Sequence, residues 1–239
     1  MTDSLTLAGR EVEAATLDLD DTLVSYRRSP GELLRAAFDA VGVDQLFPVE
    51  AYYDRFEEFS ERTDSMAELR RECFAALATE RGHDAETGRA VASAFADERD
   101  HGNVEWCRGA ERFLDTLDER AIPYAVVTNG PPDAQRQKLD AVGLSERVET
   151  VVFAGHDCPA KPDPEPVERA VAALGVDSEA VVHVGDSASD VGSAVAAGVG
   201  AVVVGEVDSG ANTVGSRARS AESLIGLHET LAGDDSESR

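Results

Sequence analysis

The pattern of apolar and polar positions divides the chain into two kinds of region. After residue 109, apolar runs of four or five residues alternate with segments whose apolar residues recur at helical spacing. Residues 26–103 show helical spacing and no convincing strand. Alternating strands and helices indicate a parallel sheet with helices on both faces. The pattern therefore predicts an α/β fold with an inserted helical bundle.

The expected elements of the α/β part follow from this alternation, with glycines as stop signals after several helices. Residues before about Val12 are expected to form a short polar lead-in, and residues 233–239 an acidic tail without a packed fold. Strands are predicted at 14–17, 124–128, 150–154, 180–184 and 201–204, and helices at 110–120, 133–142, 163–174 and 190–197.

The insert is expected to contain four helices. Ser29-Pro30-Gly31-Glu32 combines a Ser N-cap, a proline at the first helical position and a glutamate at the third, which predicts a helix ending before Gly42. Further helices are expected at 49–62, after Ser65, and at 84–99. The predicted domains are a core of residues 1–24 and 105–239 and an insert of residues 25–104.

Charge narrows the choice of partners. The formal net charge is −25, and Lys138 and Lys161 are the only lysines. A field this negative repels nucleic acid and anionic membranes, so neither is expected as a partner. The repulsion should weaken the fold in dilute buffer and be screened at molar salt, where the Debye length is about 3 Å. The composition resembles that of halophilic archaeal proteins.

Redox and targeting features indicate a soluble cytoplasmic protein. Three widely separated cysteines show neither metal-ligand spacing nor a disulfide framework. The N-terminus lacks a basic region followed by an apolar core, so no signal peptide is expected. The most apolar run, residues 194–205, is too short to span a bilayer.

The first predicted strand ends in the acidic stretch Asp18-Leu19-Asp20-Asp21-Thr22. Ligands of open α/β sheets bind outside the carboxyl ends of the strands. Asp18 and Asp20 would point to one face of a regular strand, and their mutual repulsion favours a divalent cation such as Mg²⁺. A solvated acidic turn is the alternative. A calcium loop is disfavoured, because Leu23 and Ser29 stand where such a loop needs Gly and Glu.

Polar groups also follow the other predicted strands. Thr128-Asn129-Gly130 offers a hydroxyl and accessible turn N–H groups to a phosphate oxygen, although Asn-Gly is also an ordinary turn. Lys161, in the loop after the next strand, could give a compact positive charge to phosphate or be a surface residue. Gly185-Asp186 ends a further strand, and Asp190 could serve the site, cap the next helix, or do both.

Taken together, these motifs resemble those of the haloacid dehalogenase-like (HAD) hydrolase superfamily. Its motifs match Asp18-Leu19-Asp20-Asp21-Thr22, Thr128-Asn129, Lys161-Pro162 and Gly185-Asp186 with Asp190. The resemblance implies a Rossmann-like core, a helical cap formed by the insert, and Mg²⁺-dependent phosphoryl transfer through an aspartyl-phosphate.

The resemblance also implies a role for each matching residue. Asp18 would be the nucleophile and Asp20 the general acid and base. The carboxylates of Asp18 and Asp186 and the main-chain carbonyl of Asp20 would bind Mg²⁺. Phosphate would be bound by Thr128, Asn129 and Lys161, and Asp190 would orient Lys161 or metal-bound water.

The expected activity is hydrolysis of a small-molecule phosphate monoester by a monomer or homodimer. The dehalogenases of the superfamily lack an acid at the place of Asp20, so its presence favours a phosphatase. Relatives that cleave phosphonates need a cap lysine, and the insert has none. A sugar phosphomutase, a haloacid dehalogenase-like C–halogen hydrolase and, more remotely, a non-catalytic regulator that binds metal or phosphate remain alternatives.

Overall fold

The structure is a computed structural model, which describes residues 5–7, 10–63, 65–205 and 218–221. The chain forms two compact units, Met1–Ser25 with Val104–Arg239, and Tyr26–Asn103.

The first unit contains a six-stranded parallel sheet with the order β10-β9-β8-β3-β6-β7. The strands predicted from apolar runs are all present within one residue of their expected ends. The edge strand β10 was not expected from the sequence. The strands are β3 (Ala14–Leu17), β6 (Tyr124–Asn129), β7 (Thr150–Ala154), β8 (Val181–Gly185), β9 (Gly200–Val204) and β10 (Ala218–Ala221).

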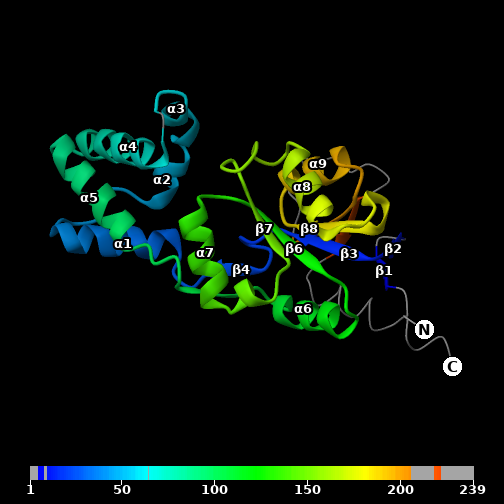
Figure 1. Cartoon of the computed structure of the whole chain (residues 1–239). Helices are drawn as coiled ribbons and strands as arrows, with labels where there is room; N and C mark the ends of the chain where they lie inside the picture. Colours follow the sequence, from blue (N-terminus) through cyan, green and yellow to red (C-terminus); the bar gives the residue numbers. More distant parts are fainter. Residues whose placement is uncertain (1–4, 8–9, 64, 206–217, 222–239) are drawn as a thin grey trace. The chain divides into compact units, whose positions relative to one another are not determined.

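Helices cover both faces of this sheet, which confirms the α/β fold class. Helix α8 packs against β6 and β7 and α9 against β8 and β9, while α6 lies on the opposite face (Figure 1). This cover explains why β3, β8 and β9 consist entirely of buried residues. The helices are α6 (Ala110–Glu119), α7 (Pro132–Ala141), α8 (Glu165–Leu174) and α9 (Ala188–Ala196).

Short elements complete the unit. Within the expected lead-in, β1 (Leu5–Leu7) and β2 (Arg10–Val12) pair as a two-stranded antiparallel sheet. β4 (Val24–Tyr26) and β5 (Val104–Trp106) form a second two-stranded sheet. Two 3₁₀ turns, Leu144–Glu146 and Ser178–Ala180, precede β7 and β8. The predicted acidic tail, residues 233–239, lies outside the described residues.

The strand order places the functional motifs. From β3 the chain moves outward through β6 and β7, and it then returns to the other side of β3 for β8 and β9. Strand order therefore reverses at β3, between β6 and β8, and ligands of such sheets bind at this switch point. The motif residues follow β3, β6, β7 and β8, whose carboxyl ends share one edge of the sheet.

The second unit is helical, as its apolar spacing predicted. Aromatic rings run through its core in successive edge-to-face contacts, from Phe38 to Phe47, Phe74 and Phe95. The capping box at Ser29 and the left-handed Gly42 after the first helix are both present. The helices are α1 (Pro30–Val41), α2 (Val49–Tyr53), α3 (Phe56–Ser60), α4 (Met66–Glu80) and α5 (Ala85–Asp97).

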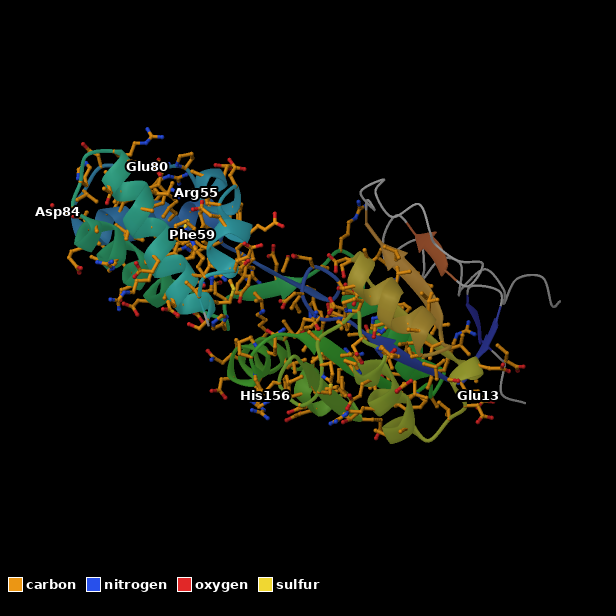
Figure 2. All side chains as sticks on the ribbon, turned by 90° about the horizontal axis from the view of Figure 1, so that it is seen from above. Glu13, Arg55, Phe59, Glu80, Asp84 and His156 are labelled. Carbon is orange, nitrogen blue, oxygen red and sulfur yellow. The ribbon has the colours of Figure 1, made fainter. Side chains whose placement is uncertain are left out.

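One predicted helix of this unit is wrong. The segment 49–62 is broken into α2 and α3, because Arg55 leaves the helical conformation at φ −108° and ψ 3°. Its guanidinium bonds Glu58 and Glu80 and lies 5.0 Å from the centre of the Phe59 ring. Figure 2 shows Arg55, Phe59 and Glu80 close together on this unit. Apolar spacing continues through the break and could not reveal it.

The boundaries predicted for the core and insert, and the action of the insert as a cap, stay predictions. Within the described ranges, none of the helices combines the length and the apolar character needed to cross a bilayer.

Candidate functional site

The loop after β3 holds Asp18 and Asp20 in different surroundings. Asp18 continues the β3–β8 ladder by donating its N–H to the Val184 carbonyl at 2.8 Å. The chain then turns through Asp21, whose φ of 58° is left-handed. Buried Leu19 accepts backbone hydrogen bonds from Leu23 and Val24, which closes the turn. The loop therefore returns on itself at once, and the two carboxylates diverge.

Lys161 is the centre of the buried part of the site. Its ammonium group donates to Asp18 Oδ1 at 2.6 Å, Asp190 Oδ1 at 2.6 Å and the Val127 carbonyl at 2.7 Å. These contacts use all three donors of the ammonium group. The Lys161 side chain is only 2% exposed, so the interpretation of this residue as a surface lysine is wrong.

The loop that carries Lys161 is anchored by Asn129 at the end of β6 and by residues of α9. The Asn129 amide accepts from the Lys161 N–H at 2.9 Å and donates to the Lys161 carbonyl at 3.1 Å. Ser193 of α9 donates to the Asp163 carbonyl at 2.6 Å. Gly192 allows Pro162 to approach, because a Cβ there would lie 2.9 Å from the proline Cβ. The Asn129 side chain thus positions the backbone of the Lys161 loop.

Asp190 lies on the third residue of α9 and is not its N-cap. Ser187 is the N-cap, and the two residues form a capping box, so the helix begins earlier than predicted. Asp190 Oδ1 accepts from Lys161 and contacts His183 Nε2 at 3.2 Å, while Oδ2 accepts from the Ser187 N–H at 3.0 Å and from its hydroxyl. Both carboxylate oxygens therefore have protein partners.

Gly185 makes room for this arrangement. A Cβ at Gly185 would lie 2.3 Å from the Asp190 Cγ, a distance that no side chain tolerates. The other nitrogen of buried His183, Nδ1, is 2.9 Å from Thr16 Oγ1 on β3. A chain of polar contacts therefore runs from β3 through β8 and α9 to Lys161.

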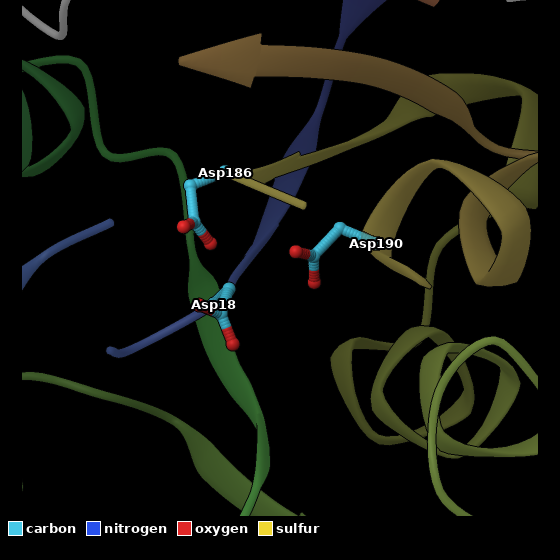
Figure 3. A group of neighbouring side chains, drawn as sticks. All are labelled: Asp18, Asp186 and Asp190. Carbon is cyan, nitrogen blue, oxygen red and sulfur yellow. The ribbon is translucent and has the colours of Figure 1, made fainter. Parts of the chain in front are cut away.

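Asp186 completes a group of three acids with Asp18 and Asp190. Their carboxylates face a common space in Figure 3, with one oxygen from each lying within 4.8 Å of the others. The Thr22 hydroxyl lies 3.4 Å from Asp186 Oδ1. Three carboxylates thus gather at one place, and Lys161 bonds only two of them, Asp18 and Asp190, which leaves an excess of negative charge.

Burial and charge act differently on these groups. Burial raises the pKa of Asp18 to about 7, and the charges of Asp190 and Asp186 add to this effect while Lys161 opposes it. The pKa of Asp190 is lowered, because hydrogen bonds and charge from His183 and Lys161 outweigh its burial. The negative charges of Asp18 and Asp190 raise the pKa of Lys161, although burial of the ammonium group acts in the opposite direction.

Asp20 turns to different partners, which the sequence analysis missed. Lys138 Nζ lies 2.6 Å from Asp20 Oδ1, and Gln135 Nε2 donates to Asp20 Oδ2 at 2.8 Å and to Thr128 Oγ1 at 2.5 Å. Gln135 and Lys138 lie on the buried face of α7 with Ala134 and Leu139. The sequence did hold a signal for these partners, because Gln135 and Lys138 recur at the same helical spacing as the apolar residues of this short helix.

Comparison with known proteins agrees with the motifs. The family model described as haloacid dehalogenase-like hydrolase matches residues 12–198. A phosphoserine phosphatase of Thermus thermophilus is 38% identical over 137 residues, which are 57% of this chain and 54% of that protein. The pyrophosphatase PpaX of Halalkalibacterium halodurans is 28% identical over 201 residues, covering 82% of this chain and 84% of PpaX. The chain thus aligns with about half of the first relative and most of the second.

The fold has solved counterparts as well. The HAD-hydrolase YfnB of Bacillus subtilis, whose structure contains magnesium, superposes with a TM-score of 0.73. The two chains are 18% identical, and the superposition covers 92% of this chain and 98% of YfnB. The chain belongs to the haloacid dehalogenase-like hydrolases.

Proposed function

We propose that this protein is a Mg²⁺-dependent phosphatase that hydrolyses a small-molecule phosphate monoester through a phosphoryl group carried on Asp18. The observation that carries the proposal is the separation of the two acids after β3. Asp18 is buried beside Lys161, and Asp20, whose side chain is 39% exposed, is held on the other side by Lys138. A nucleophile and an acid–base group need this kind of separation in environment.

Asp18 is the proposed nucleophile. Lys161 binds its Oδ1, which leaves Oδ2 to form the bond to phosphorus while the bond to the leaving oxygen breaks. Asp20 donates a proton to the departing alcohol. Asp20 then takes a proton from a water molecule that attacks the same phosphorus, and the bond between Asp18 and phosphorus breaks. The second step returns both acids to their starting states.

The residues present fit a magnesium ion. Asp18 and Asp186 offer carboxylate oxygens near each other, whereas both oxygens of Asp190 already have protein partners. The excess of carboxylates over ammonium groups favours a cation, and Mg²⁺ prefers such oxygen ligands. Asp18, Asp186 and the main-chain carbonyl of Asp20 would hold it. Magnesium would offset the charge that builds up on the phosphoryl oxygens.

Phosphate binding is assigned to groups at the end of β6 and in the loop after β7. Thr128 contributes its hydroxyl and Asn129 its main-chain N–H, since the Asn129 side chain is bonded to the Lys161 loop. Lys161 adds positive charge beside Asp18. Asp190 acts through Lys161 and is a positioning residue. The phosphatase names of the two curated relatives support this reaction class.

The proposal is tested by trapping the phosphorylated enzyme. Protein in molar KCl with Mg²⁺ is mixed with a panel of aryl, alkyl and sugar phosphates, quenched within milliseconds and examined by mass spectrometry. We expect phosphate release and an adduct on Asp18 in the wild type, and neither with Asp18→Asn. Asp20→Asn should lose about 10²–10⁴-fold in turnover and accumulate the adduct.

Two outcomes would contradict this assignment. No phosphate release across the whole panel would refute the phosphatase, and a parallel panel of 2-haloacids would then test the dehalogenase alternative. A phosphoryl adduct that persists in Asp18→Asn would refute the nucleophile, because an amide cannot accept the phosphoryl group in this way.

A further inference from the structure

Lys138 is a buried ammonium group that lies outside the four motifs named above. The chain has only two lysines, and both contact an acid of the loop after β3. Lys161 contacts Asp18, and Lys138 contacts Asp20. The Lys138 side chain is 5% exposed. Lys138 lies on α7, more than a hundred residues after Asp20 in the sequence. An amphipathic helix normally directs a lysine to solvent, so this inward position requires a reason.

Gln135 contributes the second contact, one turn earlier on the same helix. Its side-chain amide donates one N–H to Asp20 Oδ2 and the other to Thr128 Oγ1. Nε2 is the donor in both contacts, so the nitrogen end of the amide faces Asp20 and Thr128. Gly130 leaves the space that this amide needs, since a Cβ there would lie 3.0 Å from Gln135 Cδ and Nε2.

Electrostatics shows why Asp20 needs such contacts. The adjacent Asp21, the nearby Asp18 and a net charge of −25 all repel its carboxylate. Asp20 is also the more exposed member of its pair with Lys138, with 39% of its side chain accessible. Without the two contacts, repulsion would favour rotamers that turn the carboxylate toward solvent and away from Thr128.

We propose that Lys138 and Gln135 are positioning residues for Asp20. One binds each carboxylate oxygen, and together they hold the acid–base group beside the hydroxyl of Thr128. This inference rests on the phosphatase function proposed above and extends it. Lys138 orients Asp20 and does not itself contact the substrate, so its effect on the reaction is transmitted through Asp20.

The test uses the dependence of rate on the leaving group. The ratio kcat/KM includes the step in which the leaving oxygen departs, and 4-nitrophenolate needs little help from an acid, whereas an alkoxide needs much. Lys138→Met and Gln135→Ala should each lower kcat/KM for an alkyl phosphate by about tenfold or more, and for 4-nitrophenyl phosphate by less than about threefold. Lys138→Arg should recover part of the loss, because it keeps a cationic donor.

Two neighbouring residues supply matched controls on α7. Arg136→Met removes the same charge from a side chain that is 60% exposed, and Gln137→Ala removes the same amide from an exposed position. Neither control should change the ratio of the two substrates. The double variant Asp20→Asn with Lys138→Met should be no slower than Asp20→Asn alone, because Lys138 acts through the carboxylate that is already gone.

Equal losses on both substrates in Lys138→Met, or a double variant slower by the full product of the two single losses, would overturn the proposal. Crystal structures of Lys138→Met and Arg136→Met give a test independent of turnover. The Asp20 carboxylate should leave its place beside Thr128 in the first variant and keep it in the second. If the Asp20 carboxylate keeps its place in the Lys138→Met structure, the positioning role is overturned. If the wild type hydrolyses none of the phosphate esters, only the proposed phosphatase activity is refuted.

Discussion

Replacing Lys161 with methionine removes the ammonium group that joins Asp18 and Asp190 and keeps an unbranched side chain of similar length. The side chains of the two acids are 9% and 3% exposed, so neither can recover full hydration. Removing one partner of a buried ion pair costs about 3–5 kcal/mol, because the remaining charge is left uncompensated. The variant should therefore fold with a clearly reduced free energy of unfolding.

The loss should depend on pH, because a buried carboxylate can take up a proton instead of staying charged. Neutralising Asp190 from its ordinary pKa of 3.8 costs about 4 kcal/mol at pH 7 and about 1.5 kcal/mol at pH 5, at 1.36 kcal/mol per pH unit. In the variant the folded carboxyl has a raised pKa and binds more protons than the unfolded chain, so its stability rises as pH falls. In the wild type the raised pKa of Asp18 already gives part of this trend, whereas the lowered pKa of Asp190 gives a stabilising contribution that is lost only below about pH 4.

The measurement is urea unfolding at pH 7 and pH 5 in 2 M KCl with EDTA. It is followed by the fluorescence of Trp106, the single tryptophan, which belongs to the same compact unit as the site. Arg169→Met is the matched control. It removes one positive charge from an exposed pair with Glu165 on α8 and should cost less than about 0.5 kcal/mol at either pH.

A loss below about 1 kcal/mol in Lys161→Met at pH 7, the size expected of a surface pair, would refute the reasoning. Equal losses at pH 7 and pH 5 would also refute it, since the penalty would then not arise from buried carboxylates.

Three further predictions concern packing and charge. Gly88→Ala should destabilise the helical unit by about 1–3 kcal/mol, because the new Cβ would lie 2.2 Å from the Phe74 carbonyl oxygen. This loss should appear despite the higher helix propensity of alanine, and an unchanged denaturation curve by circular dichroism would contradict it. Gly185→Ala should lower turnover about 10²-fold by displacing Asp190, and a wild-type kcat would show that this close contact does not matter. Lowering KCl from about 2 M to about 0.05 M should lower the melting temperature through unscreened repulsion of the −25 charge, and a constant value in calorimetry would count against a salt-dependent fold.

The sheet and most helices could be predicted from the sequence, because their signals are local. Strands such as Val181–Gly185 and Gly200–Val204 are buried on both faces, so nearly all of their residues are apolar and the strand can be recognised from its own sequence. Ser29 and Gly42 mark the ends of a helix through contacts within a few residues. The strand-end motifs are local as well, and the rule that parallel strands share a carboxyl edge assigned them to one place.

Contacts between distant segments could not be predicted in this way. Arg55 breaks a helix whose apolar spacing is continuous, and it does so with a contact to Glu80 on a different helix. β1 pairs with β2, and β10 pairs with β9, although none of these short segments carries a strong strand pattern. Ser187, rather than Asp190, is the N-cap of α9, and Asp190 joins that cap to Lys161 and His183.

Asp18 and Asp20, the two acids after β3, show most clearly what could and could not be predicted from the sequence. The sequence alone determined that Asp18 and Asp20 lie two residues apart at a strand end, and that a positive group must offset their repulsion. Only the tertiary structure decided that each acid has its own lysine. Lys161 reaches Asp18 across 143 positions of sequence and Lys138 reaches Asp20 across 118. Such pairings depend on the rotation of α7 and the path of the loop after β7 relative to the sheet. Those are set by the packing of whole elements, which no short stretch of residues encodes.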